Sequence, residues 1–242
     1  RTHYPATLDD GMEITSQEAW TRRGGAIETT VPPYVRETAE QLAFLAREDK
    51  KVDKRSGVSQ RLPISVLENV VSNAERRALA AGEALAVPRI ADLYAALPSI
   101  TGKIELEYEG ELKGGDQVAR ELIRLAVGRV YNRYYDGVNM SSVIQWFDLG
   151  GTLKLDDTAG SETMLRQLES IQGLMEKTAA LGLGASEPDA VRVSAAEFVL
   201  EGLYAHRRIS RSEEHGFGAE EKKPAGSKDD GPRPNLRRPQ YN

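Results

Sequence analysis

The stretch "RSGVSQRLPISVLENVVSNAERRALAAG", residues 55–82, decides the fold that the sequence predicts. Its apolar residues recur at spacings of three and four: Ile64, Leu67, Val71, Ala74 and Ala78. This is the period of an α-helix that buries one face, and a glycine such as Gly82 commonly follows a helix end. We therefore expect a helix from about Pro63 to Ala81 that packs through one face against other helices.

The same helical period continues on both sides of this stretch. It predicts further helices over about 33–47, 89–97, 116–135, 162–179 and 194–208, and a short helix that follows Thr15. We expect Thr15 to form a capping box with Glu18, and Asp116 and Ser161 to cap the helices that they precede. The fold class is therefore predicted as mainly α, with one helical bundle followed by a second helical unit.

Two segments depart from the helical period. In "KIELEYEGE", residues 103–111, apolar and acidic residues alternate, which predicts a short strand over about 104–108. From about Ser212 onward the composition changes to Pro, Gly and charge, as in "KKPAGSKDDGPRPNLRRPQYN", residues 222–242. Such a segment has too few apolar side chains to form a core, so residues 212–242 are predicted to be a disordered tail.

Composition excludes several classes of function. The 242 residues include no cysteine, so disulfides, thiolate metal sites and cysteine nucleophiles are ruled out, and a reducing cytoplasmic location is expected. A net charge of −5 argues against a nucleic-acid partner that is bound through a basic face. No apolar run approaches the length of a membrane span, so no membrane association is expected.

Common catalytic motifs are missing from the sequence. The pair Gly102-Lys103 is followed by Ile104 instead of Ser or Thr, so it does not complete a phosphate-binding P-loop. The segment "GVSQR", residues 57–61, lacks the last glycine of a hydrolase nucleophile elbow. The three histidines, His3, His206 and His215, are scattered, so we expect no metal site.

Aromatic and acidic groupings have a structural and a functional interpretation. Tyr131, Tyr134 and Tyr135 could stack on a nucleic-acid base, but aromatic side chains at helical spacing more often pack in a core or an interface. The pair Asp156-Asp157 could take part in acid–base chemistry, but paired acids are mostly found in solvated loops. For both groupings we expect the structural role.

One residue of the deciding stretch needs a functional explanation. Arg61 stands where the helix opens, and a positive charge there is unfavourable by roughly a few tenths of a kcal/mol. A guanidinium that faces an anionic group would offset this cost through charge-assisted hydrogen bonds. An arginine that simply extends into solvent is the alternative interpretation.

Gly57, Ser59 and Arg61 form a G-x-S-x-R segment that resembles the lid of AAA+ ATPases of the magnesium-chelatase-like group. In that family the arginine of such a segment, at the start of a lid helix, is called sensor 2. The resemblance continues through "AERRAL" (74–79), "RIADLYAALPSITGKIELEYEGE" (89–111) and "LEGLYAHRRISRSEE" (200–214), and covers most of residues 1–217. It implies that Gly57, Ser59 and Arg61 contact the nucleotide and that Arg61 acts in catalysis.

The resemblance also implies a domain organisation. Residues 1–31 would be a remnant of the ATPase core edge and a linker, because "RTHYP" resembles the last core strand of the ATPase module. Residues 32–112 would form the AAA+ lid, residues 113–211 a C-terminal helical region, and residues 212–242 the disordered tail. The P-loop and the magnesium-binding acids of the family would lie upstream, so the chain would be the C-terminal part of a longer ATPase.

The resemblance further implies cofactors and partners. The full-length protein would bind ATP and Mg²⁺, neither of which this chain would hold alone, and would assemble into a ring, which we expect to be a hexamer. A protein with a von Willebrand factor A-type domain would be its partner, in metal chelation or in the remodelling of other proteins. Two alternatives remain open: a non-catalytic helical adaptor that binds a protein partner, and an ATPase-linked transcriptional regulator.

Overall fold

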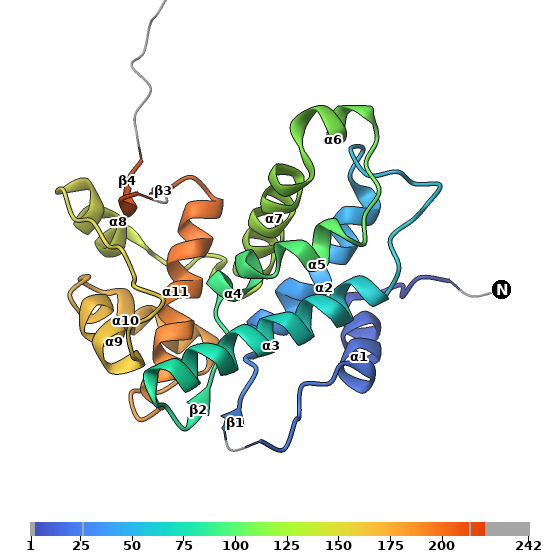
Figure 1. Ribbon diagram of the computed structural model, residues 1–242. Helices are drawn as coiled ribbons and strands as arrows, with labels where there is room; N and C mark the ends of the chain where they lie inside the picture. Colours follow the sequence, from blue (N-terminus) through green and yellow to red (C-terminus); the bar gives the residue numbers. More distant parts are fainter. Residues whose placement is uncertain (1–2, 26, 213, 221–242) are drawn as a thin grey trace, which may run out of the picture.

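The computed structural model describes residues 3–25, 27–212 and 214–220. Within this part of the chain the fold is mainly helical, which confirms the predicted fold class (Figure 1). The α-helices are α1 (Leu8–Glu18), α2 (Pro33–Glu48), α3 (Arg61–Ala81), α4 (Ile90–Ala95), α5 (Leu97–Thr101), α6 (Tyr108–Lys113), α7 (Gly115–Tyr135), α8 (Ser141–Asp148), α9 (Ser161–Glu169), α10 (Leu174–Lys177) and α11 (Asp189–Ala205). A 3₁₀ helix, η1 (Thr178–Leu181), follows α10.

In the described part of the chain, four short strands form two small sheets. β1 (Glu28–Thr29) pairs in parallel with β2 (Leu85–Ala86), and Glu28 lies opposite Leu85. β3 (Ile209–Ser212) pairs antiparallel with β4 (Gly216–Ala219) in a hairpin, where Arg211 lies opposite Phe217. The first sheet joins the segment before α2 to the segment after α3, and the hairpin closes one end of the fold near α8 and α11 (Figure 1).

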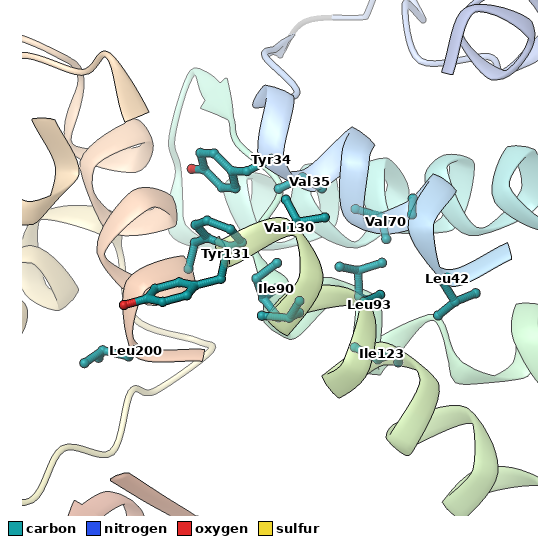
Figure 2. Close-up of a cluster of buried hydrophobic side chains, with 14 of the residues drawn as sticks. Tyr34, Val35, Leu42, Val70, Ile90, Leu93, Ile123, Val130, Tyr131 and Leu200 are labelled. Atoms are coloured by element: carbon teal, nitrogen blue, oxygen red, sulfur yellow. The ribbon is translucent and has the colours of Figure 1, made fainter. Parts of the chain in front are cut away.

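Helix α2 lies at the centre of the fold because it is apolar on more than one face. It packs along α7 and also contacts α1 and α3. Helix α7 in turn packs on α11, which also contacts α9 and α4. Figure 2 shows side chains from these helices meeting in one cluster, with Val35, Leu93 and Ile123 fully buried.

This core runs through both of the helical units that the sequence predicts. One continuous cluster of buried apolar residues extends from Ala19 to Phe217, and it includes residues on both sides of position 112. The expected boundary, after residue 112, falls inside the last turn of α6, and the shared core continues across it. The division of the chain at residues 31, 112 and 211 stays a prediction.

Aromatic side chains fill the contact between α2, α7 and α11. Tyr131 stacks on Tyr135 with ring centroids 4.6 Å apart, and Tyr34 stacks on Phe198 at the same distance. The Tyr34 hydroxyl donates a hydrogen bond of 2.8 Å to Ser194 Oγ, so burial leaves that group satisfied. The structural role expected of the tyrosines on α7 is confirmed, because Tyr131 and Tyr135 are buried.

The helix caps differ from the predicted ones. The first capping box consists of Thr7 and Asp10, so α1 ends close to the point where a helix was expected to begin. Thr15 is buried inside α1, where its hydroxyl donates a hydrogen bond to Glu40 on α2. Tertiary burial of Thr15 thus replaces the local capping that its sequence context suggests.

The other two predicted caps lie one or two residues inside their helices. Gly114 precedes α7, and Asp116 lies in the first turn. Gly160 precedes α9, and Ser161 is its first residue. The Ser161 backbone N–H and hydroxyl both donate hydrogen bonds to the Glu83 carboxylate, which therefore caps α9 from a segment far away in the sequence.

Three expected segments are also corrected. The strand predicted over 104–108 is reduced to a single bridge between Leu106 and Val52. Helix α6 begins at Tyr108, directly after this bridge, because glutamates are unfavourable in a strand. The helix predicted over 162–179 is interrupted by Gly173, whose φ of +80° separates α9 from α10. Of the predicted disordered tail, Ser212 ends β3 and residues 216–219 form β4 with Phe217 buried, while 213 and 221–242 lie outside the described residues.

Candidate functional site at the start of helix α3

The structure brings Gly57, Ser59 and Arg61 together in one short loop that leads into α3. Arg61 is the first residue of this helix, and its backbone N–H donates a hydrogen bond of 3.2 Å to Ser59 Oγ. The Arg61 side chain is exposed, and among the described residues its guanidinium has no hydrogen-bond or ion-pair partner. The Arg61 guanidinium therefore lies at the N-terminal end of the 21-residue helix α3, where the helix dipole also favours an anion.

Glycine is required at position 57 for two reasons. Gly57 has a φ of +70°, a conformation that residues with a side chain rarely adopt. A Cβ atom at this position would lie 2.4 Å from the Tyr4 hydroxyl oxygen. That hydroxyl also accepts a hydrogen bond of 3.2 Å from the Val58 N–H, so the glycine lets Tyr4 hold the loop.

Gln60, immediately before Arg61, joins three helices. Its Nε2 lies 2.8 Å from Glu40 Oε1 on α2, and within hydrogen-bond distance of Thr15 Oγ1 and the Gly11 carbonyl on α1. Its Oε1 accepts a hydrogen bond of 2.8 Å from Arg47. The residue that positions the start of α3 is thus fixed by α1 and α2.

Arg47 holds the same loop from the other side. Its Nε donates a hydrogen bond of 3.0 Å to the Val58 carbonyl, and its guanidinium lies 4.4 Å from the centre of the Tyr4 ring. Burial raises the pKa of nearby Glu40, although the hydrogen bonds from Gln60 and Thr15 oppose the shift. The loop is therefore anchored through partly buried polar groups, while the Arg61 side chain at its end stays exposed.

Sequence reasoning missed a second group of charges, which lies in the interior. Glu197 and Glu201 of α11 are 2% and 1% exposed, and Arg89, before α4, is 1% exposed. Arg89 contacts Glu197 at 3.3 Å and the more exposed Asp157 at 2.6 Å. The sequence did contain a signal for these buried charges: two glutamates lie four residues apart within the apolar run "SAAEFVLEGLY". Charged residues on a buried helix face need partners, so this pattern indicates buried ion pairs.

Glu201 has the most perturbed carboxyl group of this second cluster. Its Oε1 lies 2.5 Å from Arg211 of β3, and its Oε2 has no hydrogen-bond partner among the described residues. Burial raises the pKa of Glu201 to about 7, although the positive charge of Arg211 opposes the shift. Glu197 and Tyr94 also face this carboxyl group.

The raised pKa of Glu201 predicts a pH dependence of stability. Because this pKa is about 7 in the folded chain and ordinarily 4.5, the folded chain binds more protons between these values. The contribution of Glu201 to stability is therefore complete below pH 4.5 and is lost as the pH rises through 7. When the pH is lowered from about 8 to about 5, the free energy of unfolding of the wild type should rise by about 2–3 kcal/mol relative to that of Glu201→Gln.

Urea unfolding at several pH values, followed by circular dichroism, would measure this difference. The variant is the appropriate reference because other titrating groups affect both proteins equally. Parallel curves of unfolding free energy against pH for the two proteins would contradict the prediction.

No cluster of three or more His, Asp or Glu side chains in the described ranges is arranged to hold a metal ion. His206 contacts the Gly128 carbonyl at 3.2 Å and lies against Tyr131, which is a packing role. Among the helices described, none is long and apolar enough to cross a membrane.

Comparison of this chain with protein-family models, with curated proteins and with solved structures finds no match.

Proposed function

We propose that this chain is the lid and C-terminal helical region of a magnesium-chelatase-like AAA+ ATPase, with Arg61 as the residue that contacts the nucleotide. The observation that carries the proposal is the exposed guanidinium of Arg61 on the first turn of α3, without a partner among the described residues. In the full-length protein this group would face the γ-phosphate of ATP. It would stabilise the negative charge that develops during phosphoryl transfer.

The arrangement around Arg61 supports the proposal in physical terms. An arginine and a helix N-terminus both favour an anion, so their combination has a use if a phosphate is bound there. Gln60 contacts Thr15 of α1 and Glu40 of α2 and accepts a hydrogen bond from Arg47 of α2, all through partly buried contacts. The position of Arg61 would then depend on α1, which follows directly the segment that resembles the last core strand.

The remaining elements of the proposal follow from the same resemblance. The full-length protein would bind ATP and Mg²⁺, assemble into a hexameric ring and act in the cytoplasm on a partner with a von Willebrand factor A-type domain. Its activity would be metal chelation or the remodelling of other proteins. Gly57 and Ser59 would shape the nucleotide contact, Gly57 through its backbone conformation and Ser59 through its hydrogen bond to Arg61.

Arg61→Ala in the full-length protein tests the proposal. The chain is joined to its upstream coding sequence, and ATP turnover of the variant is compared with that of the wild type. We expect turnover to fall about ten-fold or more, which corresponds to about 1.4 kcal/mol of lost transition-state stabilisation. Circular dichroism should show an unchanged fold, because the Arg61 side chain is exposed.

Arg76→Ala is the matched control. Arg76 is also an exposed arginine of α3 and lies about four turns away from Arg61, so its replacement should leave turnover unchanged. Equal turnover in the wild type and Arg61→Ala would reject the role of Arg61. If no P-loop lies upstream, the ATPase function itself is rejected and the helical adaptor becomes the better interpretation.

A further inference from the structure

A polar cavity lies apart from the loop that carries Arg61. It has a volume of about 430 Å³, and its walls come from α4, α7, α11, residues 153–157 and the β3–β4 hairpin. A cavity of this size accommodates a small organic molecule. None of its lining residues belongs to residues 57–61, so its role is independent of the proposed nucleotide contact.

Two cations in the walls lack a carboxylate partner within the described chain. Arg124 of α7 donates a hydrogen bond of 3.1 Å to the Ala205 carbonyl, and Lys154 donates one of 3.0 Å to the Glu214 carbonyl. A carbonyl oxygen orients a cation but does not neutralise its charge. Arg124 and Lys154 therefore leave uncompensated positive charge at the cavity.

The carboxylates in the same walls already have cationic partners. Glu121 contacts Lys51 at 3.6 Å and also Lys113, and neither lysine lines the cavity. Glu197 and Asp157 both contact Arg89, which likewise lies outside the lining. Arg124 and Lys154 are therefore lining cations whose charge none of these carboxylates contacts.

Glu201 gives the cavity a second recognition element. This side chain lines the cavity and is 1% exposed, and its Oε2 has no hydrogen-bond partner among the described residues. A buried acceptor without a donor is unfavourable, so a ligand that brings a donor to it gains affinity. Arg211, which holds Oε1, lies over the rings of Tyr94 and Phe217 at 4.8 and 5.5 Å and is thereby fixed in place.

We propose that this cavity binds a small organic anion that also carries a hydroxyl or amino group. The anionic group, a carboxylate or a phosphate, would contact Arg124 and Lys154. The hydroxyl or amino group would donate a hydrogen bond to Glu201. The site therefore selects for a ligand that combines both groups and discriminates against a simple anion.

Titration of the ¹⁵N-labelled chain with glycolate and with glycerol 3-phosphate tests this proposal by NMR. One probe carries a carboxylate and the other a phosphate, and both carry a hydroxyl group, so the stronger binder identifies the anion. Saturable shifts at cavity residues are expected for at least one of them below about 10 mM. Absence of saturable binding for both probes would overturn the proposal.

Variants of the cavity residues locate the bound anion. Arg124→Gln and Lys154→Gln should each raise Kd about ten-fold, and two separate variants protect the test if one of them folds poorly. Arg129→Gln is the matched control, because Arg129 lies on the same helix and pairs with the exposed Glu48, outside the cavity. Equal affinity in Arg124→Gln, Lys154→Gln and Arg129→Gln would overturn the proposal.

A further comparison tests the donor contact at Glu201. The hydroxyl-bearing probes should bind more tightly than acetate and inorganic phosphate, and Glu201→Gln should reduce that preference. The same preference in the wild type and in Glu201→Gln would reject the contact. None of these measurements involves ATP or Arg61, so their failure is distinguishable from failure of the proposed ATPase function.

Discussion

Arg89→Met is expected to lower the free energy of unfolding by about 3–5 kcal/mol. The Arg89 side chain is 1% exposed and lies 3.3 Å from the buried carboxylate of Glu197. Methionine fills much of the same volume but carries no charge, so Glu197 would be left buried without a cation. Its remaining hydrogen bond, from the Ala91 N–H at 2.7 Å, does not replace a full positive charge.

A double-mutant cycle separates this charge effect from a loss of packing. In Arg89→Met/Glu197→Gln the buried charge is removed together with its partner, and the side-chain amide oxygen introduced on α11 can still accept from the Ala91 N–H. Most of the lost stability should therefore return in the double variant. Guanidinium unfolding followed by circular dichroism measures all four proteins.

Arg166→Met provides the comparison for a surface ion pair. Arg166 pairs with Glu162 one turn away, and both side chains are exposed at 71% and 72%. Its replacement should change the free energy of unfolding by less than about 1 kcal/mol. A similarly small loss for Arg89→Met would show that the buried pair does not stabilise the fold.

Gly202→Ala is expected to destabilise the fold by about 2–3 kcal/mol, through overpacking at the contact between α7 and α11. A Cβ atom at Gly202 would lie 1.9 Å from Cδ2 of Tyr131. Tyr131 has little room to move away, because its ring stacks on Tyr135 and lies against Phe198. Urea unfolding of the variant measures the loss.

Gly128→Ala is the matched control at the same helix contact. A Cβ atom at Gly128 would lie 3.4 Å from the Ala205 Cβ, which is an ordinary van der Waals contact. Alanine favours a helix by up to about 1 kcal/mol over glycine, so this variant should be as stable as the wild type or slightly more stable. Equal stability of Gly202→Ala and Gly128→Ala would contradict the packing argument.

Helical periodicity was a reliable guide because it reflects burial of one helix face. The spacing of apolar residues after Arg61 predicted α3 to within two residues at its start, and Pro33 marked the first residue of α2. The loop with Gly57, Ser59 and Arg61 was also evident, since a glycine and an arginine at these positions conflict with a simple helix start. Local sequence was sufficient for these elements because their determinants lie within a few residues.

Features that depend on distant residues could not be predicted in this way. Thr15 has the local context of a cap but is buried against Glu40, and Ser161 contacts Glu83 across 78 residues of sequence. The β3–β4 hairpin lies in a segment of polar composition, where Ile209 and Phe217 are apolar side chains that reach the core. Each of these contacts is formed by packing and not by local propensity.

The sequence alone thus determines the helical class, the main helix faces and the exposed arginine at the start of α3. The tertiary structure decides that one core joins the helices on both sides of residue 112, and that Arg89, Glu197 and Glu201 become buried charges beside a cavity. The physical reason is the distance along the sequence between the residues that interact. Helix periodicity depends on neighbours three and four residues apart, whereas a buried ion pair requires two helices to be packed before its charges meet.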